Sequence, residues 1–141
     1  MFPEGKRILV VDNEASRRAL VERILGEEGF EVVAAAEGLT ALRTLQRKRF
    51  SLIVAALDLP GTLDGLATVR QARARQPGLR ALFTADFVPR KRCDDPELDD
   101  FIAFPFHRRE LLGCVFELLQ RNPASDVADL ARRCRTLPHA S

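Results

Sequence analysis

Apolar runs of strand length alternate with amphipathic helical patterns along this chain, and this alternation constrains the fold more than any single motif. Five runs are apolar over most of their length: 7–11, 31–35, 51–56, 79–85 and 99–104. Helical patterns of the kind seen in 15–30, 39–48, 65–75 and 108–122 lie between or after them. Strands without polar alternation are typical of a parallel sheet covered by helices on both faces. The sequence therefore predicts an α/β fold.

One segment departs from the alternation between the last two predicted strands. It reads "DFVPRKRCDDPEL" and contains Pro89, Pro96 and no apolar stripe. Prolines at these positions predict a loop or short turn in place of a full crossover helix. The fourth helix of the fold is therefore expected to be short or missing.

The last residues, 123–141, are expected to form a tail that follows a domain at 1–122. Ser125 is a good N-cap for a short extra helix, and Arg132, Arg133 and Arg135 come late in it, which suits the helix dipole. One face of this helix would be apolar and would carry Val127, Leu130, Ala131 and Cys134.

Size and composition fit one globular domain with an ordinary core. The 141 residues are 46% hydrophobic and 30% charged, and the net charge is +2. So small a charge indicates no nucleic-acid partner, and no apolar run approaches the ~20 residues of a membrane span. Cys93, Cys114 and Cys134 are odd in number and lack metal-ligand spacing, which favours reduced thiols and a cytoplasmic location.

Functional side chains of an open parallel sheet collect at the carboxyl ends of its strands. Four predicted strand ends place polar or unusual residues there: Asp12, Asn13, Ala56, Asp58, Thr84 and Phe104. The chain has no glycine-rich phosphate loop of the GxxxxGK type, and its two histidines stand apart from any nucleophile. We therefore expect a binding module and no enzymatic activity.

Five short motifs in order resemble the receiver domain of bacterial two-component response regulators. They are "ILVVDNE", "AAAEGLTAL", "LPGTLDG", "LFTA" and "DDFIAFPF", and the resemblance covers about residues 6–121. It implies a flavodoxin-like, doubly wound five-stranded parallel sheet with strand order 2-1-3-4-5. It also implies phosphoryl transfer from a histidine kinase to an aspartate, with Mg²⁺, an acidic pair, a lysine and a hydroxyl in support.

Most of these functional residues are replaced at the matching positions of this chain. Counting back from Pro60 puts the acceptor at Ala56, whereas counting from Asp64 puts it at Leu57, and neither side chain can accept a phosphoryl group. The acidic pair becomes Asp12 and Asn13, the lysine becomes Phe104, and the hydroxyl position is kept as Thr84. Asp12 is a weak metal candidate by itself, so Mg²⁺ binding is expected to be weak or absent and no cofactor is predicted.

Our main interpretation is a degenerate receiver that binds another protein independently of phosphorylation. The alternative is a working receiver in a two-component phosphorelay that is phosphorylated at the displaced Asp58. An unusually wide apolar arc on the last helix supports an interaction role, and Leu112, Val115, Phe116 and Leu119 are its predicted contact residues. The tail helix or a second copy in a homodimer could cover this arc, and the sequence favours neither.

Overall fold

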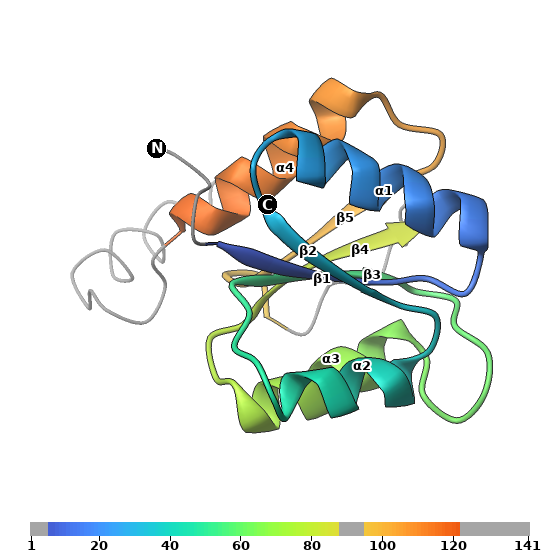
Figure 1. The fold of residues 1–141 in the computed structure, drawn as a ribbon, viewed down its shortest axis with the longest axis vertical. Coiled ribbons are helices and arrows are strands. Elements are labelled where there is room, and N and C mark those ends of the chain that lie inside the picture. The colour runs from blue at the N-terminus through green and yellow to red at the C-terminus, as the bar shows by residue number, and fades with distance from the viewer. Residues whose placement is uncertain (1–5, 88–94, 122–141) are drawn as a thin grey trace, which may run out of the picture.

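A central sheet of five parallel strands organises the protein (Figure 1). The computed structural model describes residues 6–87 and 95–121. The strand order is β2-β1-β3-β4-β5, which confirms the predicted topology. The strands are β1 (Arg7–Val11), β2 (Glu31–Ala35), β3 (Leu52–Ala56), β4 (Arg80–Ala85) and β5 (Asp99–Ala103).

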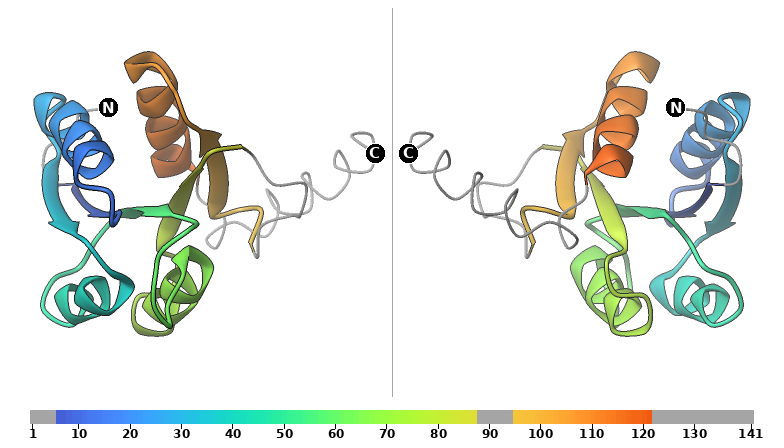
Figure 2. Two further views of the ribbon diagram at one scale, coloured as in Figure 1. Left: turned by 90° about the vertical axis from the view of Figure 1, so that its right-hand side faces the viewer. Right: turned by 90° about the vertical axis from the view of Figure 1, so that its left-hand side faces the viewer.

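Helices cover both faces of the sheet and create two apolar cores (Figure 2). One face carries α1 (Ala15–Glu27) and α4 (Arg108–Gln120), and the other carries α2 (Gly38–Leu45) and α3 (Gly65–Arg75). All five residues of β3 are buried, because both of its faces are covered. The apolar strand runs in the sequence therefore predicted the layered arrangement correctly.

The two unusual segments of the sequence are only partly described. Among the described residues between β4 and β5, which are 86–87 and 95–98, the backbone forms bends and turns and no helix. Residues 88–94 lie outside the description, and so does the predicted tail helix within 123–141. No helix in the described ranges combines the length and apolar character needed to cross a bilayer.

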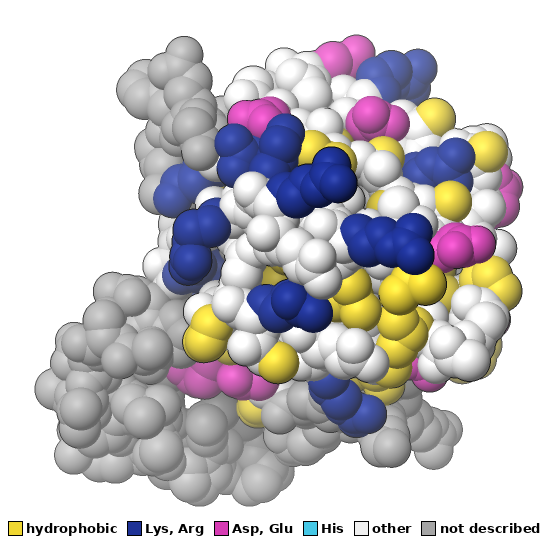
Figure 3. All heavy atoms as spheres, turned by 60° about the horizontal axis from the view of Figure 1, so that its bottom comes forward, with side chains coloured by type: hydrophobic (Ala, Val, Ile, Leu, Met, Phe, Trp, Pro, Cys, Tyr) yellow, Lys and Arg dark blue, Asp and Glu magenta, His cyan; other side chains and the backbone are white. Residues whose placement is uncertain are grey.

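The side of the molecule that carries α2 and α3 is rich in basic side chains. Figure 3, in which this side is turned forward, shows Lys and Arg spread across the surface beside an apolar strip. α2 and the turn after it contribute Arg43, Arg47, Lys48 and Arg49, and α3 contributes Arg70 and Arg75. The small net charge of the chain therefore conceals a distinctly basic side.

The start of α3 lies in close contact with the end of β3. A Cβ atom on Gly65 would lie 2.3 Å from the carbonyl oxygen of Ala56 and 2.8 Å from the Cα atom of Leu57. The backbone N–H of Gly65 also donates to the carbonyl oxygen of Leu57, at 3.1 Å. Only a residue without a side chain allows this approach, which fixes the loop after β3.

We predict that Gly65→Ala lowers the free energy of unfolding by about 1–3 kcal/mol, because the methyl group overlaps the β3 backbone. Gly26→Ala is the matched control, since a Cβ on Gly26 in α1 meets no atom within 4 Å. That control should raise the free energy by about 0.5–1 kcal/mol. Urea denaturation measures both changes, and equal effects of the two substitutions would contradict the packing argument.

Candidate functional site

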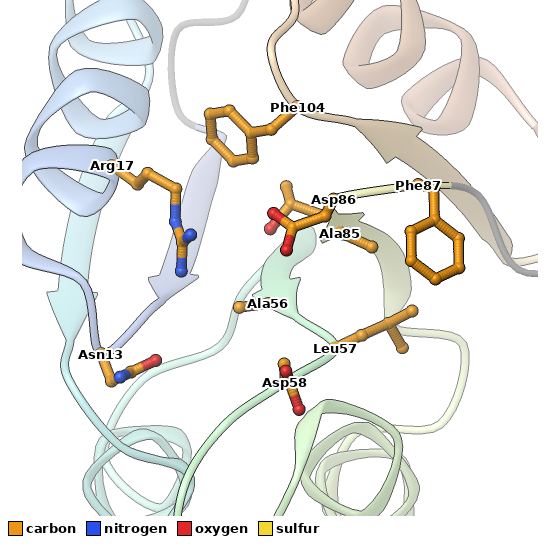
Figure 4. A pocket seen from close by; sticks show the side chains of 10 residues that line it. Asn13, Arg17, Ala56, Leu57, Asp58, Ala85, Asp86, Phe87 and Phe104 are labelled. Atoms are coloured by element: carbon orange, nitrogen blue, oxygen red, sulfur yellow. The ribbon is translucent and has the colours of Figure 1, made fainter.

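A cleft opens at the carboxyl ends of β1, β3, β4 and β5, where the sequence places its unusual residues. Its volume is about 440 Å³. Figure 4 shows the side chains that surround it, with Arg17 entering from α1 and Phe104 from the end of β5. The lining residues are Asn13, Arg17, Ala56, Leu57, Asp58, Thr84, Ala85, Asp86, Phe87 and Phe104.

Arg17 forms a two-pronged ion pair with Asp12 beside this cleft. Its Nε donates to Oδ2 of Asp12 at 3.1 Å, and its Nη2 donates to Oδ1 at 3.0 Å. Asp12 is only 4% exposed, and its Oδ1 also accepts the backbone N–H of Glu14 at 2.9 Å. Both carboxylate oxygens are therefore satisfied by groups of the chain itself.

The guanidinium of Arg17 has a raised pKa. The hydrogen bond to Asp12 is the largest cause that raises the pKa of Arg17. The nearby charges of Asp12, Glu14 and Asp86 raise this pKa further, whereas burial lowers it. The guanidinium is thus a permanent cation at any physiological pH. Sequence reasoning missed Arg17 and Asp86 as site residues.

Phe104 packs against this cation and provides the aromatic wall of the cleft. The guanidinium carbon of Arg17 lies 5.4 Å from the centroid of the Phe104 ring, within cation–π range. The ring also contacts Phe106, with centroids 4.3 Å apart. An ammonium group at position 104 would instead meet Arg17 as a like charge.

Ala56 and Thr84 form the floor of the cleft on adjacent strands. They are direct partners in the β3–β4 register, and each is 4% exposed. Ala56 is the last residue of β3, and Leu57 follows it with a half-buried side chain that packs on the α2–α3 core. The register therefore favours Ala56 over Leu57 as the position that would face a reacting group.

Asn13, Asp58 and Asp86 lie at the exposed rim of the cleft. In Figure 4 the Asp86 carboxylate lies across the cleft from Arg17, whereas Asp58 lies below Ala56. Asp58 is thus at the solvent side of the loop after β3. The cleft brings together all six predicted pocket positions except Asp12, which meets it through Arg17.

Comparison with known proteins gives the same family as the five sequence motifs. The response regulator receiver domain model matches residues 8–116. The chain belongs to this family. Protein PetR of Rhodobacter capsulatus is 33% identical over 130 residues, which is 91% of this chain and 54% of PetR. The chain spans about half the length of the curated relatives it matches.

Solved receiver structures share the fold. A response regulator receiver protein from Sinorhizobium medicae superposes with a TM-score of 0.75 at 24% identity, covering 82% of this chain and 95% of the other. The response regulator TrrA from Thermotoga maritima, solved in complex with Mg²⁺ and BeF, gives a TM-score of 0.70 at 27% identity. That match covers 80% of this chain and 98% of TrrA.

The residues of this receiver do not fit a magnesium site at the cleft. Mg²⁺ requires near-octahedral oxygen ligands, usually including one or two carboxylates. Arg17 occupies both oxygens of Asp12, and Ala56 contributes a methyl group. In residues 6–87 and 95–121, no three His, Cys, Asp or Glu side chains lie together as a metal-binding group.

The predicted contact residues on α4 separate into buried and accessible ones. Val115 is 0% exposed and Leu119 is 6% exposed, and both pack in the core under α1 and α4. The prediction that these two form a contact surface is therefore wrong, because the sheet already covers them. Leu112 and Phe116 are half-buried, and Phe116 contacts Phe30 with ring centroids 5.7 Å apart.

We predict that Arg17→Met lowers the free energy of unfolding by about 1–3 kcal/mol, because the buried Asp12 carboxylate loses its partner; the partial exposure of Arg17 limits the loss. Asp12→Asn added to that variant should restore part of the loss. Arg23→Met is the control, since Arg23 is an exposed residue of the same helix. Urea denaturation at low and high salt measures all of these variants, and equal losses for Arg17→Met and Arg23→Met would refute the role of the ion pair.

Proposed function

We propose that this receiver domain signals through protein–protein contact without a phosphorylation cycle. The observation that carries the proposal is the ion pair of Arg17 with Asp12 beside the methyl group of Ala56. Phosphoryl transfer to a receiver needs an acceptor carboxylate and a metal ion that neutralises the phosphoryl oxygens. Here the acceptor position is apolar, and an internal cation occupies Asp12, the remaining carboxylate of the acidic pair.

The proposed loss of phosphorylation is also supported by the nature of the cation, because a side chain stands where a metal ion would be needed. A bound metal ion can dissociate and exchange with solution, whereas Arg17 is part of α1 and stays beside Asp12. TrrA was solved with Mg²⁺ and BeF, which shows what a responsive relative can bind. The pocket of this chain would instead remain in one charge state, and the domain would present a constant surface to its partner.

The proposed partner is another protein that contacts the accessible part of α4. Leu112 and Phe116 retain exposed apolar area at the side of α4 nearest α1. Arg108 adds surface ion pairs from the start of α4 to Glu27 and Glu28 at the end of α1. A rigid apolar patch of this kind suits a signalling protein or a second copy as partner.

Introducing the family's carboxylate and lysine at positions 56 and 104 tests whether Arg17 prevents Mg²⁺ binding. We predict that Arg17→Met/Ala56→Asp/Phe104→Lys binds Mg²⁺ at least about tenfold more tightly than Ala56→Asp/Phe104→Lys, a difference of roughly 1.4 kcal/mol. The reason is that only the first variant frees the oxygens of Asp12. NMR titration with Mg²⁺ and beryllofluoride, followed at Asn13 and Thr84, gives the affinities, and equal binding by the two variants would disprove the role.

Acetyl phosphate tests the absence of a phosphorylation cycle directly. We expect the wild-type chain to keep its intact mass after incubation with acetyl phosphate and Mg²⁺, because the acceptor position is Ala56 and Arg17 occupies both oxygens of Asp12. Asp58→Asn is the matched control. A base-labile phosphoryl group on the wild type that is absent from Asp58→Asn would establish the alternative in which Asp58 is the acceptor.

A further inference from the structure

A shallow groove runs along the outer edge of the sheet, between β5 and α4, away from the cleft described above. Its lining residues are Phe101, Ile102, Ala103, Pro105, Glu110, Gly113, Cys114 and Glu117. On the floor of the groove, Ile102 is buried on the α4 face of β5, whereas the ring of Phe101 stacks on Phe83 in the α2–α3 core on the opposite face. The groove therefore offers an apolar floor at an edge strand, a place that native proteins usually cover.

The rim of this groove is acidic. Among the described residues, its two charged lining side chains are Glu110 and Glu117, and Asp100 lies close by. Burial raises the pKa of the Cys114 thiol, the charges of Asp100, Glu117 and Glu110 raise it further, and the charge of Arg121 opposes them, so all three carboxylates lie near this thiol. The groove thus contrasts with the basic side formed by α2 and α3.

The chain leaves the described structure at one end of this groove. Arg121 pairs with Glu117 at 2.9 Å, approaches Asp100 at 3.9 Å, and donates to the backbone carbonyl oxygen of Asp99 at 3.3 Å. These contacts hold the end of α4 beside the start of β5. Residues that follow Arg121 therefore begin next to the acidic and apolar surface.

The sequence of the tail complements the groove in charge, apolar pattern and length. Its predicted helix has one apolar face and three late arginines. Residues 127–134 of a helix extend about 10 Å, as do residues 110–117 of α4. Five residues, 122–126, span up to about 17 Å, which is enough to reverse direction beside α4. Antiparallel packing would put the arginines near Glu110 and Asp126 near Arg121.

We infer that the groove between β5 and α4 is the docking site for residues 123–141 of the same chain. The apolar face with Val127 and Leu130 would lie on Pro105 and Cys114, and the late arginines would meet the acidic rim. Covalent attachment gives the tail a high effective concentration at the groove, so a modest affinity suffices. This docking is independent of whether the Arg17–Asp12 pair excludes Mg²⁺.

The native cysteines provide a distance test in the full chain. In a Cys93→Ser background, Cys114 lies in the groove and Cys134 lies on the predicted apolar face of the tail. We expect a short bismaleimide to link these two thiols within one molecule, as judged by intact mass and peptide mapping at low protein concentration. Leu130→Asp should lower the yield by about tenfold, because it puts a carboxylate on the apolar floor.

The matched control is Ala128→Asp, which adds the same charge away from the predicted apolar face and should leave the yield unchanged. A second readout is the amide NMR signals of Gly113 and Glu117, which should shift in Leu130→Asp and stay in place in Ala128→Asp. Links that form only between two molecules would make a second copy the occupant and overturn the inference. Absence of the internal link together with unchanged NMR signals would also overturn it.

Discussion

A carboxylate that is 4% exposed needs a counter-charge, and in this receiver Arg17 supplies it to Asp12 from the first turns of α1. The cost of burying Asp12 is offset by two charge-assisted hydrogen bonds and by the backbone N–H of Glu14. Because the guanidinium belongs to the chain, its position does not depend on any ion in solution. The buried carboxylate at the carboxyl edge of the sheet is therefore neutralised by the chain itself.

The other unusual residues of the cleft follow from this pair. With Ala56 at the end of β3, Asp12 is the buried carboxylate that one guanidinium can neutralise. A lysine at position 104 would place a second cation about 5 Å from Arg17, whereas the face of Phe104 attracts the guanidinium. Ala56, Phe104 and Arg17 are thus one coupled set. Placing the family's residue at only one of these positions would leave an unbalanced charge.

The sequence predicted the fold well because the signals of a parallel sheet are local. Apolar runs gave the strands, and counting back from Pro60 located Ala56 at a strand end, where the register with Thr84 puts it. Arg17 escaped notice because a charged residue in an amphipathic helix usually faces water. Its signal was its place early in α1, since helical side chains point back toward the N-terminus and a long one reaches the end of β1. Val115 and Leu119 were misjudged because the apolar arc of α4 packs on both the sheet and the α1 side.

A net charge of +2 also conceals how charge is distributed over the surface. Basic side chains gather on the side of α2 and α3, while the groove beside α4 is lined by glutamates. A basic segment is repelled from the first surface and attracted to the second, so the choice of surface is electrostatic even where the contacts are apolar. If the cleft is fixed in one state, as we propose, occupancy of the groove provides a way to change the surface that a partner meets. The domain would then be regulated from the edge of its sheet and not from its phosphorylation pocket.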